Sequence, residues 1–309
     1  MTTSFDHNYC ANFQETMIVE GLAPPSLPID DGAIHRFRVE GDKADTTNGW
    51  YILHGGQIPA GAFGCWKRAI STTWCAISEN KMDPKQRKQY EHRMEHTKAL
   101  RAKEKYLRQK KAAINCGCIW IKASPYIDIK HSYLIAKQIK PIGLKQFKNS
   151  LLIPIQNSLG ELINLQSITP DGTKRFMYGG AVKACYTVIG ELLTAAFVCE
   201  GYATGVTIHQ ATNKCVIVAF NAGNLLPVIK SITTTSPDIE LVIAADNDHC
   251  SVSNVGLDKG KLAAKAFGLP LVYPLFQKGL DGSDFNDLAA VVGIKEVSDQ
   301  LAHCFKEVS

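Results

Sequence analysis

Four short apolar runs near the C-terminal end most strongly limit what this chain can fold into. They lie at residues 195–199, 215–220, 241–245 and 269–273. None alternates polar with apolar residues, and each has the length of a β-strand. Helix-like stretches separate them, at residues 203–211, 225–233 and 256–267. Strands of this kind, alternating with helices, predict an α/β fold with a parallel sheet buried on both faces.

Two of these runs end in acidic residues. Glu200 follows the first run, and Asp246 and Asp248 follow the third. Because open parallel sheets bind ligands outside the carboxyl ends of their strands, we expect the three carboxylates to converge at one edge. An Asp-x-Asp pair alone also fits an ordinary cap or turn. Three clustered carboxylates suit a divalent cation, Mg²⁺ (or Mn²⁺), that can polarise a phosphoryl oxygen.

Small residues follow two of the runs, where a phosphate would approach the chain. Gly201 comes directly after Glu200 and is expected to permit a sharp turn. The second run ends in a small-residue loop, in which Gly223 and Asn224 are candidates for anion binding.

This combination of a Glu-Gly pair, a glycine loop and an Asp-x-Asp pair resembles the Toprim domain, which bacterial-type primases, topoisomerases and some nucleases share. The resemblance covers about residues 196–292 and implies a Rossmann-like parallel sheet with an acidic metal site. It implies that Glu200 is an acid/base or metal ligand and that Asp246 and Asp248 bind metal. Asp284 matches the first aspartate of a third acidic motif found in primases.

The sequence departs from the primase pattern at two positions. Asn286 stands where the third motif has its second aspartate, and Thr204 stands where primases often carry an aspartate four residues after the glutamate. Both departures weaken the case for a second or third metal ion.

The middle of the chain narrows the resemblance from Toprim proteins in general to primases. Residues 152–161 are similar to the strand-turn-strand that opens the catalytic core of bacterial primases. Lys174, Arg175 and Lys183 then match its basic positions, and Lys259 is a further candidate for contact with phosphate. The chain as a whole resembles the primase portion of phage- and plasmid-type primases or primase–helicases. The stretches that carry this likeness are residues 30–37, 49–54, 60–64, 201–204 and 222–226.

The composition suggests four parts in the 309 residues. They are a small N-terminal α+β unit (1–79), a basic helix or linker (80–113), a small basic α+β subdomain (114–195) and the Toprim domain (196–309). In the first part, short strands are expected near 34–39 and 50–54, and the glycines from 61 to 64 read as a turn. Its aromatic residues, such as Trp50 and Phe63, are either core or a base-stacking surface.

The charge is concentrated in one segment. Residues 81–111 hold twelve lysines and arginines against four acids, whereas the whole chain carries a net charge of +5. The pair Asp83-Pro84 predicts the start of a long helix that is polar almost all round. Such a segment is either a solvated linker or a contact for a polyanion such as nucleic acid.

Other features set limits on location and partners. No run approaches the ~18 apolar residues of a membrane helix, and no secretion signal is visible, so we expect a cytoplasmic protein without membrane contact. The ten cysteines show no zinc-ribbon spacing and are expected to be reduced. No phosphate-loop motif is present, so a replicative helicase would be supplied by another chain.

These observations predict a nucleotidyltransferase, a DNA primase module that makes short primers from nucleoside triphosphates on single-stranded DNA. Two alternatives stay open. A Toprim nuclease would use similar acids to activate water, and a non-catalytic accessory protein would bind single-stranded DNA with a degraded metal site.

Overall fold

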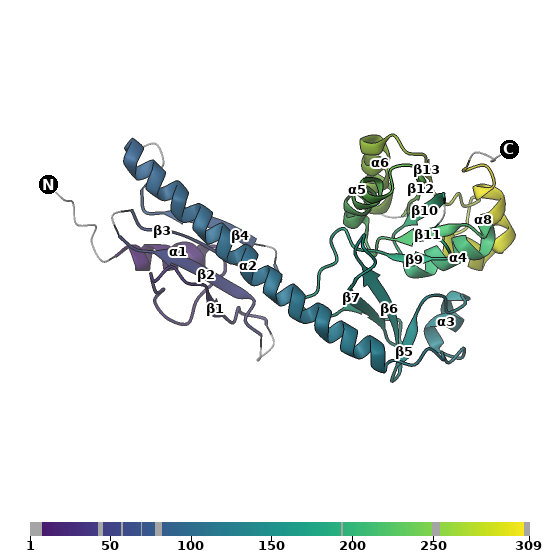
Figure 1. Ribbon diagram of the computed structural model, residues 1–309, viewed down its shortest axis with the longest axis horizontal. Coiled ribbons are helices and arrows are strands. Elements are labelled where there is room, and N and C mark those ends of the chain that lie inside the picture. The colour runs from purple at the N-terminus through teal and green to yellow at the C-terminus, as the bar shows by residue number, and fades with distance from the viewer. Residues whose placement is uncertain are drawn as a thin grey trace. The chain divides into compact units, whose positions relative to one another are not determined.

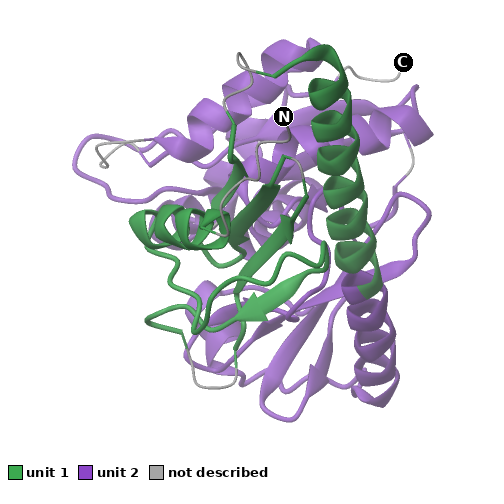
Figure 2. Ribbon diagram, turned by 90° about the vertical axis from the view of Figure 1, so that its left-hand side faces the viewer, with its two compact units in different colours: residues 1–107 green, residues 108–309 purple. Residues whose placement is uncertain are grey.

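The computed structural model describes residues 8–42, 46–56, 58–68, 70–77, 82–192, 194–248 and 254–305. The chain forms two compact units, residues 1–107 and 108–309, whose boundary falls within one long helix (Figure 2). The finer division into four parts stays a prediction.

The first unit is built on an antiparallel sheet with the strand order β1-β2-β3-β4. Its strands are β1 (His35–Phe37), β2 (Gly49–His54), β3 (Ala60–Cys65) and β4 (Ile70–Cys75), preceded by α1 (Tyr9–Val19). Phe13 and Met17 of α1 pack with Tyr51, Leu53 and Phe63 on one face of the sheet. Trp50 and Phe63 are buried, as the core alternative predicted.

The expectation of a turn at residues 61–64 is wrong, because these residues lie in the buried strand β3. The glycines serve close strand packing. A Cβ on Gly61 would lie 2.3 Å from the carbonyl oxygen of Ile52, and one on Gly64 would lie 2.1 Å from that of Ile70. This run of small residues therefore resembles a turn in the sequence but forms a central strand of the sheet.

The basic helix α2 runs from Pro84 to Lys122, so it begins where the sequence predicted and continues beyond residue 113. Its start is a capping box. The Asp83 carboxylate accepts a hydrogen bond from Gln86 N at 2.8 Å, and the Gln86 side chain accepts one from Asp83 N at 2.9 Å.

The second unit contains a small antiparallel sheet with the order β5-β6-β7-β8 (Figure 1). Its elements are α3 (Ser132–Lys137), β5 (Lys145–Phe147), β6 (Ser150–Gln156), β7 (Leu162–Ile168) and β8 (Lys174–Phe176). Cys116 at the end of α2 packs with Leu152 and Leu165 of this sheet. The strand-turn-strand predicted around residues 152–161 is therefore confirmed as β6 and β7.

The same unit contains the predicted parallel sheet, with the order β13-β12-β10-β11-β9. Its strands are β9 (Thr187–Ile189), β10 (Ala195–Cys199), β11 (Cys215–Val218), β12 (Glu240–Ala244) and β13 (Leu271–Val272). All neighbours are parallel except β9, which pairs antiparallel with β11. The helices are α4 (Tyr202–Thr212), the short 3-10 turn η2 (Ala222–Asn224), α5 (Leu225–Thr235), α6 (Val255–Phe267), α7 (Phe285–Val292) and α8 (Ile294–Leu301).

Both faces of this sheet are buried, as the unbroken apolar runs predicted. Side chains such as Phe197 and Val242 pack with α4, α7 and α8 on one face, and their neighbours Val198 and Ile243 pack with α5 and α6 on the other. Figure 1 shows α5 and α6 on one side of the sheet and α4 and α8 on the other. The α/β, Rossmann-like fold class is thus confirmed. In the described part of the chain, no helix is both long and apolar enough to cross a membrane.

Candidate functional site

The strand order creates a crevice at one point of the parallel sheet. From the central strand β10 the chain adds β11 on one side and β12 on the other. The carboxyl ends of β10 and β12 therefore form the topological switch point, where open α/β sheets bind ligands. Cys199 pairs with Ala244 in this register, so Glu200 and Asp246 leave neighbouring strand ends.

Glu200 and Asp246 meet against the start of α6. A Cβ on Gly256 would lie 3.0 Å from both Glu200 Oε1 and the Asp246 carbonyl oxygen. Glycine suits this position, because a Cβ would push these neighbours away by a few tenths of an ångström. The structure thus brings together two acids that lie far apart in the sequence.

Each of these two acids has a buried oxygen with no hydrogen-bond partner, Oε1 of Glu200 and Oδ1 of Asp246. Burial, followed by the charge of Asp248, raises the pKa of Glu200 to about 7. Burial, followed by the charges of Glu200 and Asp284, raises the pKa of Asp246 to about 8. Buried, unpaired carboxylates that repel one another are costly, and a cation would offset that cost.

Two further acids complete the group. Asp248 is held next to α6, because its backbone N–H donates to Asn254 Oδ1 at 3.1 Å and Asn254 caps that helix. Asp284 caps α7 and accepts hydrogen bonds from Asp287 N at 2.8 Å and from Thr204 Oγ1 at 2.9 Å. Glu200, Asp248 and Asp284 all lie close enough for their charges to act on Asp246.

The two departures from the primase pattern have structural roles. Thr204 donates its hydroxyl to Asp284 and so fixes that carboxylate. Asn286 is buried, and its side-chain amide donates to the carbonyl of Lys137 at 2.7 Å and to Thr207 Oγ1 at 3.0 Å. Asn286 therefore ties α7 to α3 and α4 and is not directed to a ligand.

The acids fit a cation as a partial ligand set. In the parts of the chain that the structure describes, no three His, Cys, Asp or Glu side chains are arranged to hold a metal ion. The two unpaired oxygens of Glu200 and Asp246 nevertheless offer ligands of the kind that Mg²⁺ prefers. Mg²⁺ commonly takes one or two carboxylates and completes its shell with water and phosphate oxygens.

Lys174 is the basic candidate that the structure relates to the acids. It lies on the exposed strand β8, with its Nζ 5.7 Å from the centre of the Tyr133 ring. Neighbouring protein atoms partly desolvate its ammonium group. This desolvation, followed by the positive charge of Lys137, lowers the pKa of Lys174. Asp284 and Asp246 act on that pKa in the opposite direction, so they lie within electrostatic range.

The structure does not relate the other basic candidates to the acids. Arg175 on β8, Lys183 before β9 and Lys259 on α6 are all exposed. Within the described residues, none of them forms an ion pair with the acids. Their contact with phosphate stays a prediction.

The loop after β11 differs in part from expectation. The backbone N–H of Ala222 donates to Glu200, which opposes the rise in the pKa of that acid. Gly223 lies in this loop with its Cβ position 3.4 Å from Asn221 Oδ1. Gly201 has φ −99 and ψ 147, an extended conformation, so the sharp turn that requires glycine is absent there.

The expectation that Asn224 binds an anion is wrong for its side chain. Asn224 is buried, and its amide nitrogen donates to the carbonyls of Val182, Cys185 and Ala219 at 2.8–3.0 Å. Its Oδ1 accepts from Ala184 N at 2.8 Å. Every polar atom is used inside the chain, so Asn224 anchors the loop.

Sequence reasoning missed three side chains near the acids. Lys137 Nζ lies 3.3 Å from Asp287 Oδ1, and the hydroxyl of Tyr133 is buried without a hydrogen-bond partner. Asp287 could have been found, since it closes the acidic segment 283–287. Tyr133 and Lys137 lie on the short helix α3, which no periodicity in the sequence indicated.

Comparison with known proteins agrees with this geometry. Residues 195–295 match the family model described as "Toprim domain". Over 271 residues, 82% of the chain, it is 30% identical to a DNA primase TraC of Escherichia coli, and over 281 residues it is 31% identical to a second TraC sequence from the same species. The chain spans only 25% and 19% of the lengths of these relatives.

Solved primase structures are more distant. The primase fragment of the bacteriophage T7 primase-helicase is 13% identical and has a TM-score of 0.41, covering 58% of this chain and 78% of that one. The DnaG primase catalytic domain bound to ssDNA is 11% identical and has a TM-score of 0.44, covering 65% and 80%. The fold and site define a Toprim-domain protein. Within that class, the chain is similar to the DNA primase TraC sequences over more than four-fifths of its length.

Proposed function

We propose that this chain is a DNA primase module, a nucleotidyltransferase that joins nucleoside triphosphates into a short primer on single-stranded DNA and releases pyrophosphate. The observation that carries the proposal is the pair of buried, unpaired oxygens of Glu200 and Asp246 at the switch point of the Toprim sheet. The relatedness to TraC primases supports the same reaction.

A divalent cation fits this site. Glu200 and Asp246 would hold Mg²⁺ or Mn²⁺ through their two unpaired oxygens, and Asp248 and Asp284 would add charge beside it. When bound, such an ion neutralises phosphate charge and polarises the phosphoryl oxygen under attack.

The chain's own residues would take up the proton and bind the phosphates. Glu200 would either bind the ion or take up the proton of the primer 3′-hydroxyl. Its pKa of about 7 without bound metal suits the second role near neutral pH. Lys174 would bind the triphosphate from the opposite side, because its charge already interacts with Asp284 and Asp246. Arg175, Lys183 and Lys259 would bind more distant phosphates, and the backbone at Gly201 and Gly223 would allow close approach.

The proposed partners are a single-stranded DNA template and nucleoside triphosphates. The net positive charge of residues 81–111 supports template binding that weakens with salt. A replicative helicase on a separate chain remains a prediction.

The test is incorporation of labelled nucleotides on a defined single-stranded template with Mg²⁺ or Mn²⁺. Asp246→Asn should lower synthesis by at least 100-fold, roughly the loss expected for a group that stabilises charge in the transition state. Asp238→Asn is the matched control, because Asp238 is exposed and precedes the same strand that Asp246 follows. Equal synthesis by wild type and Asp246→Asn would overturn the proposal, and shortening of the strand without nucleotides would favour a nuclease.

A further inference from the structure

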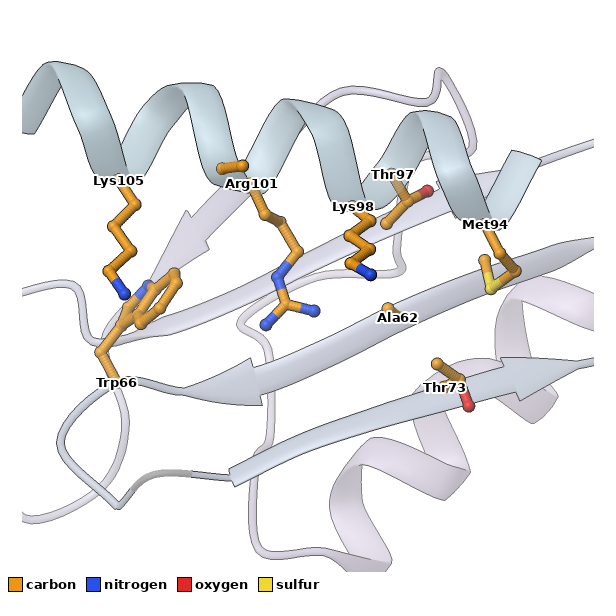
Figure 3. A pocket seen from close by; sticks show the side chains of 9 residues that line it. Ala62, Trp66, Thr73, Met94, Thr97, Lys98, Arg101 and Lys105 are labelled. Atoms are coloured by element: carbon orange, nitrogen blue, oxygen red, sulfur yellow. The ribbon is translucent and has the colours of Figure 1, made fainter. Parts of the chain in front are cut away.

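A second candidate site lies in the first unit, far along the chain from the Toprim acids. A pocket of about 500 Å³ opens between α2 and the sheet strands β3 and β4. Lys98, Arg101 and Lys105 of α2 line one side, and Ala62, Trp66 and Thr73 contribute to the other (Figure 3). Its volume is within the usual range for small-molecule sites.

The charge of this pocket is one-sided. Three of its lining side chains are cations, and none of the nine is acidic. Lys98, Arg101 and Lys105 lie three and four residues apart, so they share one face of the helix over about 10 Å. Figure 3 shows all three reaching from the helix toward the strands. An anion with several charges along its length would satisfy this row.

Arg101 is a fixed group and not a solvated surface cation. Its guanidinium lies 4.0 Å from the centre of the Trp50 ring, and its Nη2 donates to Ser71 Oγ at 3.1 Å. Its Nε is buried without a hydrogen-bond partner, and burial lowers the pKa of Arg101. A buried donor without an acceptor is uncommon in proteins, and it shows how tightly this guanidinium is enclosed.

The opposite wall is suited to a flat ring. Trp66 provides aromatic surface on this wall, and Thr73 lies on the exposed surface of β4. Met94 adds apolar surface from α2 at the other end of the pocket (Figure 3). The end of the Lys105 side chain lies next to the Trp66 ring (Figure 3). Aromatic surface beside a row of cations is the combination by which proteins bind single-stranded nucleic acid.

We propose that this pocket binds nucleotide units, with a base against Trp66 and the phosphates along Lys98, Arg101 and Lys105. The units can come from a single strand or from a free nucleoside triphosphate. The site uses none of the Toprim acids, so it stands whether or not the chain synthesises primers.

The experiment measures binding of a fluorescent oligothymidylate to the full chain in EDTA, by anisotropy at several salt concentrations. Lys98→Gln with Lys105→Gln should weaken binding about tenfold and lower the salt slope by about 1.4, for two lost phosphate contacts. The control is Lys122→Gln with Lys230→Gln, which removes the same charge from exposed lysines outside the pocket and outside residues 81–111 and should change affinity less than twofold.

Further measurements identify the source of the nucleotide units and check that each variant folds. Trp66→Leu, which keeps every charge, should also weaken binding, and circular dichroism of each variant checks that it folds. If ATP binds with the same dependence on Lys98 and Lys105 while the oligonucleotide does not, the ligand is the free nucleotide. Equal loss in both lysine pairs, absence of binding to either probe, or equal competition by poly-glutamate would overturn the proposal.

Discussion

Glu200 and Asp246 stand at the ends of neighbouring parallel strands, and each carries a buried oxygen that no hydrogen bond satisfies. Burial is the main cause that raises the pKa of both acids, to about 7 for Glu200 and about 8 for Asp246, and the charge of Glu200 adds to the rise at Asp246. A fold retains such an arrangement at a functional site, because strongly perturbed carboxylates in a crevice suit ligand binding and proton transfer.

The closeness of α6 to the acids predicts that Gly256→Ala distorts the site. The new Cβ would lie 3.0 Å from Glu200 Oε1 and from the Asp246 carbonyl, so a backbone shift costing roughly 1–3 kcal/mol is expected. Thermal unfolding measures this change. Gly117→Ala in α2 is the control, because its Cβ meets nothing within 4 Å, and it should stabilise the protein by roughly 0.5–1 kcal/mol. Unchanged stability of Gly256→Ala would contradict the geometry.

The raised pKa values predict a pH dependence of stability in the metal-free protein. A carboxyl group whose pKa is higher in the folded than in the unfolded chain favours folding while protonated. Stability should therefore fall as pH rises from about 4, the unfolded value, through about 8, the folded value of Asp246.

Melting temperatures between these pH values, in EDTA, measure the effect. Asp246→Asn should flatten the decline, whereas Asp238→Asn, which removes an exposed acid at the other end of β12, should leave it unchanged. A wild-type decline no steeper than that of Asp246→Asn would contradict the assigned burial.

The four hydrogen bonds by which the Asn224 side chain anchors the loop after β11 predict a large loss of stability for Asn224→Ala. Truncation would leave three backbone carbonyls and one backbone N–H without their partner in a buried place. At roughly 1–3 kcal/mol for each unsatisfied buried group, a loss of at least about 3 kcal/mol is expected in chemical unfolding. Asn221→Ala, at an exposed position that caps no helix N–H, should change stability by less than about 0.5 kcal/mol. A small loss at Asn224 would restore its candidacy as a ligand residue.

The parallel sheet and its acids could be predicted because each signal is local. An apolar run of five residues followed by Glu200 or Asp246 is visible without knowledge of the partner strand. The roles of Asn224, Tyr133 and Lys137 could not be predicted, because their contacts come from segments remote in the chain. Lys137, for example, contacts Asp287 across 150 residues.

The glycine-rich strand β3 was predicted wrongly, as a turn, for a different physical reason. Gly61 and Gly64 are needed where neighbouring strands leave no room for a side chain, and the sequence does not distinguish that need from a turn. The same ambiguity affects Gly201, whose backbone is extended although the pattern favoured a sharp turn.

The most direct test of the central claim is Mn²⁺ binding to the full chain, followed by electron paramagnetic resonance of the free ion. We expect one site in the wild type that competes with Mg²⁺, and a loss of at least tenfold in affinity for Glu200→Gln and for Asp246→Asn, with Asp238→Asn unchanged. Wild-type affinity in both Glu200→Gln and Asp246→Asn would show that these two oxygens do not hold the cation.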